Sequence, residues 1–254
     1  MGSVKKALSK FRKRYYYHFA FRCLTFIMTV ILCIFKSNQF SVMDSFNFFK
    51  KITVFHFLWV LYMVDMVMTL VPCRKHIPLG SQKFLLKHFR PLEFFQPQNL
   101  INYVKKCNKD TLIIGAVWLA LTSTFGILYF TGLISKSILM VISMFFHVCD
   151  LICVLFWCPF RVWFMKNRCC TTCRIFNWDH MMRFSPLIFV PGFFTWSLCA
   201  MSLVVLFVWE ISFALHPERF WEGSNDALKC SNCTDRLCGE RNCVADKFSL
   251  KGGL

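Results

Sequence analysis

Long apolar stretches alternate with basic polar segments along the chain, and their lengths predict membrane-spanning helices. A spanning helix needs about 20 predominantly apolar residues. Five stretches come close to or exceed this length: roughly 18–35, 52–72, 112–134, 138–157 and 187–215. We expect Pro186, Pro191 and Gly192 to break the start of the last stretch, which leaves Phe193–Leu215 as the span. The pattern therefore predicts an all-α, polytopic transmembrane helical bundle of about five spans.

Composition narrows the class of protein further. Of the 254 residues, 56% are hydrophobic and 31 are Phe, which lies far outside the average of soluble domains. We expect one transmembrane domain over residues 18–216, preceded by a basic amphipathic interfacial segment (1–17) and followed by a cysteine-rich tail (217–254). The sequence contains no nucleotide-binding glycine loop, nucleophile elbow or zincin-type helix motif. Soluble-type hydrolase or kinase chemistry therefore has no support.

The segment 1–17 has the pattern of a helix lying on a membrane surface. Apolar residues at helical spacing are separated by lysines and arginines, and three tyrosines follow at the end of the segment. Such a helix binds anionic lipid headgroups through its basic face. The alternative is a solvated positive anchor that only orients the chain.

The distribution of charge predicts the orientation in the membrane. The formal net charge is +17, no acidic residue precedes Asp44, and the first 22 residues hold seven Lys or Arg. Segments 73–110 and 159–184 hold eight and five, whereas 36–51 and 131–137 hold three and one. Because cytoplasmic loops of membrane proteins are enriched in Lys and Arg, we expect a plasma-membrane protein with a cytoplasmic N-terminus and an external tail. This pattern explains the basic excess without a nucleic-acid partner, but a missed re-entrant segment would move the tail to the other side.

The strongest chemical motif is a set of four tail cysteines in C-x2-C-x4-C-x4-C order, Cys230, Cys233, Cys238 and Cys243. The spacing resembles that of retroviral-type zinc knuckles, with Cys238 where those have histidine. The glycine and aromatic residues of such knuckles are missing, so nucleic-acid binding is not implied. Four close thiolates suit zinc, and an iron–sulfur cluster is an alternative cofactor. An external tail would instead favour two disulfides.

A second cluster has the sequence CCTTC and contains Cys169, Cys170 and Cys173. Asp179 and His180 follow closely and could complete a metal site. The flanking arginines are expected to lower the thiol pKa values, which favours metal binding or redox chemistry. The alternative is a set of ordinary loop thiols.

Ionisable residues also occur inside the predicted spans. His147, Asp150 and Cys153 are spaced three residues apart on one helical face, and Asp65 lies at a similar depth in another span. Charges at this depth are costly, so we expect these side chains to face the bundle interior and to be paired. They could relay protons, hold a metal or activate Cys153. The alternative is simple hydrogen bonding between helices.

These features lead to one main functional hypothesis and two alternatives. The main hypothesis is an integral membrane protein with a cysteine-ligated metal site (zinc or iron–sulfur) or a thiol-redox site, of undefined reaction. The first alternative is a small transporter or proton pathway organised on Asp65, His147 and Asp150. The second is a non-catalytic membrane scaffold whose cysteines only cross-link the tail.

Overall fold

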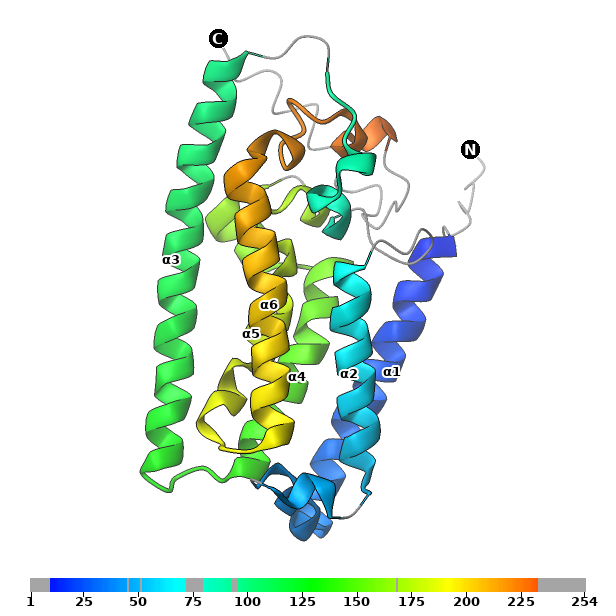
Figure 1. The fold of residues 1–254 in the computed structure, drawn as a ribbon, viewed down its shortest axis with the longest axis vertical. Helices are drawn as coiled ribbons and strands as arrows, with labels where there is room; N and C mark the ends of the chain where they lie inside the picture. The colour runs from blue at the N-terminus through cyan, green and yellow to red at the C-terminus, as the bar shows by residue number, and fades with distance from the viewer. Residues whose placement is uncertain are drawn as a thin grey trace, which may run out of the picture.

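The structure is a computed structural model that describes residues 10–44, 46–50, 52–71, 80–92, 96–167 and 169–232. This part of the chain is helical (Figure 1). Its α-helices are α1 (Lys10–Phe35), α2 (Val54–Leu70), α3 (Pro97–Phe130), α4 (Lys136–Leu155), α5 (Asp179–Phe184) and α6 (Phe193–Leu215). Short 3₁₀ segments and one π-helical segment (Phe160–Met165) connect them.

The five long helices coincide with the five apolar stretches predicted from the sequence. In the described residues, four of them (α1, α3, α4 and α6) are long and apolar enough to cross a membrane. The fifth, α2, is equally apolar in character but has 17 residues. This is the pattern of a multi-pass membrane protein.

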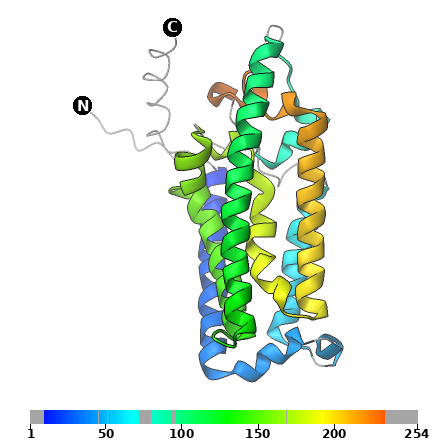
Figure 2. The ribbon, with the colours of Figure 1, turned by 90° about the vertical axis from the view of Figure 1, so that its left-hand side faces the viewer.

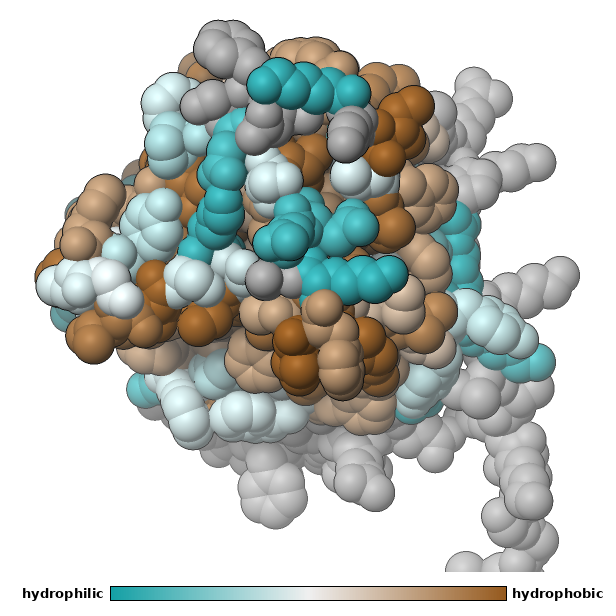
Figure 3. All heavy atoms as spheres, turned by 90° about the horizontal axis from the view of Figure 1, so that it is seen from below, coloured by the Kyte–Doolittle hydropathy of each residue, from teal (hydrophilic) through white to brown (hydrophobic). Residues whose placement is uncertain are grey.

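The outer faces of the bundle are apolar. Large hydrophobic side chains are exposed on each long helix, among them Ile27, Val64, Leu119, Phe145 and Phe207. Figure 3 views the lower end of the bundle, where a patch of hydrophilic residues is flanked by hydrophobic ones. Continuous exposed apolar surface is rare on soluble monomers, and here it matches a lipid environment.

The direction of the helices requires a return segment. We call the end of the bundle where α1 begins the N-terminal end; Tyr16 and Phe19 of α1 pack there against Phe156, just after α4. Both α4 and α6 run towards this end (Figure 1). The chain between them therefore has to descend again, and it does so through α5 and a 3₁₀ segment, Ser185–Phe189, between α3 and α6 (Figure 2).

The return segment lies inside the bundle. Arg183, Phe184 and Leu187 are almost completely buried by the surrounding helices. Pro186 lacks a backbone N–H and so interrupts α-helical hydrogen bonding where the backbone becomes 3₁₀. Irregular backbone is tolerated at membrane depth only when protein covers it, and this segment meets that condition.

The end of the described chain therefore lies at the same end of the bundle as the start of α1. Leu92 N–H donates to Ser224 O (3.1 Å) and Asp226 N–H donates to Arg90 O (2.8 Å), so the start of the tail is bound to the loop before α3. This loop belongs to the N-terminal end of the bundle (Figure 1). Residues 224–226 thus lie at the same end of the bundle as the start of α1, because the return segment reverses the chain once more. The side of the membrane on which each terminus lies stays a prediction.

The predicted interfacial segment is described only from residue 10 onwards. Residues 10–17 are the first part of α1 and continue into the first apolar stretch without a break. The division of the chain at residue 17 stays a prediction. Residues 1–9 of the predicted interfacial segment lie outside the described residues.

Candidate functional site

An ion pair joins α1 to α4 inside the bundle. Arg22 donates a hydrogen bond to the Asp150 carboxylate and another to the backbone oxygen of His147 (2.9 Å). The two charged side chains are only 14% and 19% exposed. The prediction that Asp150 is paired is thus confirmed, and its partner is an arginine from the first span rather than His147.

Arg183 of the return segment extends this pair into a network. Its Nη2 lies 3.2 Å from Asp179 Oδ2 and 3.9 Å from Asp150 Oδ2, and its Nη1 lies 3.6 Å from Asp65 Oδ2. Asp65, Asp150 and Asp179 come from three different helices and meet at this guanidinium. Buried charges need such partners because each one alone is strongly unfavourable in a membrane interior.

Within the described residues, neither of the two nearby histidines is hydrogen-bonded to Asp150. The His147 ring stands edge-on to the Tyr62 ring, with centroids 5.0 Å apart. His180 Nε2 lies 3.5 Å from Thr69 Oγ1 and 3.9 Å from Asp179 Oδ2. The predicted row of His147, Asp150 and Cys153 is therefore divided, with each side chain in a different set of contacts.

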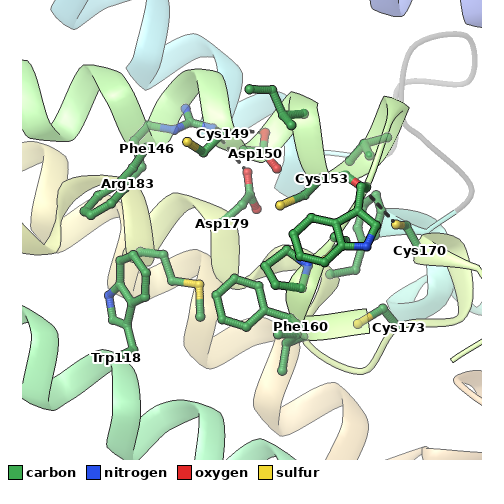
Figure 4. Close-up of a pocket in the computed structure, with 18 residues that line it drawn as sticks. Trp118, Phe146, Cys149, Asp150, Cys153, Phe160, Cys170, Cys173, Asp179 and Arg183 are labelled. Atoms are coloured by element: carbon green, nitrogen blue, oxygen red, sulfur yellow. Dashed lines mark hydrogen bonds and ion pairs between the residues drawn. The ribbon is translucent and has the colours of Figure 1, made fainter. Parts of the chain in front are cut away.

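A cavity of about 380 Å³ lies beside this network (Figure 4). Its walls come from α3, α4, α5 and the segment between α4 and α5. They are mainly aromatic and aliphatic, and include Trp118, Phe146, Ile152, Trp157, Phe160 and Phe176. Asp150, Asp179 and Arg183 supply the charged part of the wall.

Arg183 has unused hydrogen-bonding capacity at this wall. The side chain is 1% exposed, and its Nε has no hydrogen-bond partner within the described residues. Buried N–H groups are nearly always hydrogen-bonded in proteins. Because this Nε is itself enclosed, an acceptor atom in the cavity reaches it only if the Arg183 side chain moves.

Five cysteine thiols also line the cavity: Cys149, Cys153, Cys158, Cys170 and Cys173. Cys158 lies beside the thiols of Cys153 and Cys170, which contribute to lowering its pKa. Cys170 Sγ also donates to the backbone oxygen of Cys153 (3.4 Å). The last turn of α4 and the segment after it therefore bring three thiols together.

The CCTTC cluster does not gather around one point. Cys170 and Cys173 line the cavity, whereas Cys169 Sγ is hydrogen-bonded to Thr171 Oγ1 (3.1 Å) and is not part of the lining. Among the residues that the structure describes, no group of three or more His, Cys, Asp or Glu side chains could hold a metal ion. The prediction of a metal site at Cys169, Cys170 and Cys173 is therefore not supported.

The flanking arginine acts on α6 instead of on the thiols. Arg174 binds Glu210 through two hydrogen bonds, and Trp178 Nε1 donates to the same carboxylate (2.7 Å). Burial raises the pKa of Cys173 to about 11, although the sequence suggested a lowered value. The difference arises because burial outweighs the nearby positive charge of Lys83.

Lys83 fixes the same segment from the other side. It is buried, and its Nζ donates to the backbone oxygen of Cys173 (2.8 Å). Burial lowers its pKa to about 8. The loop before α3 and the CCTTC segment are thereby held together above the cavity.

The tail motif is largely outside the described residues. Cys233, Cys238 and Cys243 lie beyond Asn232, and Cys230 is described only as part of a short 3₁₀ turn, Cys230–Asn232. The geometry of the predicted four-thiolate site thus stays a prediction. The preceding residues place the start of this tail at the N-terminal end of the bundle.

Comparisons with protein families, with curated proteins and with solved structures find no match to this chain. The site therefore has to be interpreted from its own residues. Arg22, Cys158 and Arg183 were not recognised as site residues in the sequence. A signal existed for Arg22, which lies within the first apolar stretch, and for Arg183, which stands four residues after Asp179.

Proposed function

We propose that the protein binds a lipid-soluble molecule in the cavity between α3, α4 and the return segment. The observation that carries this proposal is a mainly apolar cavity lined by Arg183, a buried arginine whose Nε has no partner among the described residues. Small-molecule sites are typically concave, mainly apolar and equipped with a few polar groups that orient the ligand. This cavity has all three properties.

The volume and walls of the cavity support a compact, ring-bearing ligand. A volume of about 380 Å³ lies at the lower end of the usual range for ligand pockets, which starts at about 300 Å³. Trp118, Phe146 and Phe160 offer aromatic surfaces against which a ring can pack. A long acyl chain would have to extend from the cavity into the surrounding lipid.

The charges at the wall favour a neutral acceptor group on the ligand. Arg183 can donate a hydrogen bond, but Asp150 and Asp179 lie at the same wall and would repel an anion. A carbonyl oxygen accepts from the guanidinium without introducing a negative charge. We therefore propose an apolar molecule with a carbonyl group.

The orientation that we propose follows from the arrangement of the loops. Between Phe35 and Val54 and between Phe130 and Ile138, the sequence has four Lys or Arg, whereas its first 22 residues alone have seven. The positive-inside rule therefore supports a cytoplasmic N-terminal end, with five spans and one return segment in the plasma membrane. The start of the tail would be cytoplasmic as well, and the basic N-terminus would contact anionic headgroups.

Binding can be tested with a redox-inert probe, a ring-brominated phenyl ketone with an alkyl tail. Bromine quenches tryptophan fluorescence at short range, and Trp118 and Trp157 line the cavity. Val154 also lines it, whereas Val64 is exposed on the outer face of α2. We expect saturable quenching in the purified protein and in Val64→Phe, and at least a tenfold weaker saturable component in Val154→Phe.

The matched valine substitutions separate the cavity from general partition into detergent or lipid. If quenching rises without saturation in the wild type, the cavity does not bind the ketone. If Val154→Phe and Val64→Phe give the same saturable curve, binding takes place elsewhere. Either result contradicts the proposal.

A second candidate function is zinc binding by the tail cysteines Cys230, Cys233, Cys238 and Cys243. The observation in its favour is the docking of residues 224–226 at the basic end of the bundle. A cytoplasmic tail would be in a reducing compartment, where thiolates bind metal and disulfides are rare. The thiol geometry equally admits an iron–sulfur cluster.

Metal analysis of purified protein tests this second candidate. We expect about one zinc or one iron–sulfur cluster per chain, lost in Cys233→Ser and kept in Cys33→Ser, a cysteine of the first span. Two tail disulfides, or no metal in protein purified without chelator, would contradict it.

A further inference from the structure

We propose that Cys158 and Cys170 are a dithiol redox pair that reduces a quinone-class molecule bound in the cavity. This inference rests on the proposed function, because it names the class of ligand and a reaction at the same site. It uses thiols that the binding proposal leaves without a role.

Contacts between the thiols single out Cys158. It accepts a hydrogen bond from the backbone N–H of Arg161 (3.4 Å), and it lies beside the thiols of Cys153 and Cys170. The Cys153 and Cys170 thiols and this backbone donor lower the pKa of Cys158 and outweigh burial, which acts in the opposite direction. The thiolate is the reactive form of cysteine and the backbone N–H stabilises it, so we assign Cys158 as the nucleophile of the group.

The backbone around the thiols favours Cys170 as the redox partner of Cys158. Cys153 belongs to α4, whereas Cys158 lies beyond the helix end and Cys170 begins a 3₁₀ turn, Cys170–Thr172. A disulfide requires a specific arrangement of its two Cβ atoms. Cys158 and Cys170 lie outside α4, so their backbone can adjust to that arrangement without breaking the hydrogen bonds of the helix. Cys153 then serves to position Cys158.

The cavity matches a quinone in shape, polarity and reactivity. A quinone ring is flat and apolar, which suits the aromatic walls, and its neutral carbonyl oxygen can accept from Arg183 Nε once that side chain moves. It also takes up two electrons and two protons. Two thiols release the same number when they form one disulfide, so the exchange balances without another reactant.

The reaction proceeds in two steps. The sulfur of Cys158 first adds to a ring carbon, which forms a C–S bond. The sulfur of Cys170 then attacks the sulfur of Cys158, so that the S–S bond forms and the C–S bond breaks. The ring leaves with the electron pair as a hydroquinone, and the two protons of the thiols end on its oxygens.

The test uses full-length protein in detergent, reduced, desalted and kept free of oxygen, with a decyl-substituted benzoquinone as probe. Loss of quinone absorbance, free thiols and disulfide-linked peptides are measured on the same sample. We expect two thiols lost per hydroquinone formed and a Cys158–Cys170 linkage. Cys158→Ser and Cys170→Ser should react at least tenfold more slowly.

Cys199→Ser provides the matched control. Cys199 is a buried thiol that donates to Phe184 O (3.3 Å) and does not line the cavity, so this variant should react like the wild type. Saturable quenching by the brominated ketone shows whether each variant has kept its folded cavity. If that binding is retained in Cys158→Ser and the reaction is not slowed, the inference is wrong.

Failure of the redox inference can be distinguished from failure of the proposed function. Saturable ketone binding combined with intact thiols after quinone addition would overturn the redox pair and leave the binding site standing. A disulfide between Cys153 and Cys158 would overturn the assignment of Cys170. Quinone attached to cysteine, without any disulfide, would show simple alkylation and would also overturn the inference.

Discussion

Arg22 of α1 and Asp150 of α4 form an ion pair between two spans, 128 positions apart in the sequence. Arg183 lies on the other side of the same carboxylate, at 3.9 Å. This places the charged wall of the cavity at the junction of the first span, the fourth span and the return segment. Residues that join helices of the bundle thus also line the cavity.

Removing one member of the Arg22–Asp150 pair should destabilise the protein more than removing both. Asp150→Leu leaves the buried Arg22 guanidinium without its carboxylate, and a buried charge that loses its partner costs about 3–5 kcal/mol in proteins. Arg22→Met should cost less, because Asp150 keeps Arg183 at 3.9 Å. The double variant removes both charges, so we expect it to recover most of the lost thermal stability in detergent. A double variant less stable than either single one would contradict this interpretation.

The Asp44–Lys136 pair provides an exposed comparison for that experiment. Its side chains are 44% and 31% exposed, and exposed pairs contribute at most about 1 kcal/mol. Asp44→Leu should therefore change the unfolding midpoint much less than Asp150→Leu does.

Glu210 should hold the CCTTC segment against α6. Glu210→Gln removes the charge that binds Arg174 and weakens a charge-assisted hydrogen-bond pair. We expect Cys173, which is buried, to react severalfold faster with a thiol reagent in this variant. Glu218→Gln, near the start of the tail, should leave the rate unchanged; equal rates in wild type and Glu210→Gln would refute the role of Glu210.

Lys83 should give stability a defined pH dependence. Its pKa is about 8 in the folded protein against an ordinary value of 10.5 for a lysine, so the unfolded chain binds more protons between these pH values. The unfolding free energy of the wild type should therefore rise from pH 8 to 10.5, by at most about 3 kcal/mol. Lys83→Met should lack this rise; the same pH profile in both proteins would show that Lys83 is not responsible.

The return segment leads to a testable prediction about membrane topology. Reporters inserted after Asp110 and fused after Leu254 should read the same side of the membrane, and one inserted at Ser135 should read the other side. Opposite readings for the first two positions would mean that the segment 179–189 does not return the chain.

The long helices could be predicted because the length of an apolar run is a local property of the sequence. The return segment could not be predicted in this way. Asp179, His180 and Arg183 give it the composition of a polar loop, and Pro186 interrupts its helix. It is buried only because helices from elsewhere in the chain surround it, and this cannot be deduced from a window of sequence.

The site was predictable to a similar extent. Asp65 and Asp150 stood out because charges are rare within apolar stretches, and their need for partners followed from the cost of burial. Their partners did not follow, since Arg22 was counted with the basic N-terminus and Arg183 with a loop. The grouping of Cys158 with Cys170 depends on the turn between α4 and α5, which no spacing rule indicated.

Photolabelling with an alkyl benzophenone tests ligand binding in the cavity most directly. This probe is an apolar ketone that inserts preferentially into methionine, and Met182 lines the cavity whereas Met28 is exposed on α1. We expect label at Met182 that is displaced by the brominated ketone, lost in Val154→Phe and retained in Val64→Phe. Label confined to Met28 and other outward-facing residues, unchanged by Val154→Phe, would contradict a ligand site inside the bundle.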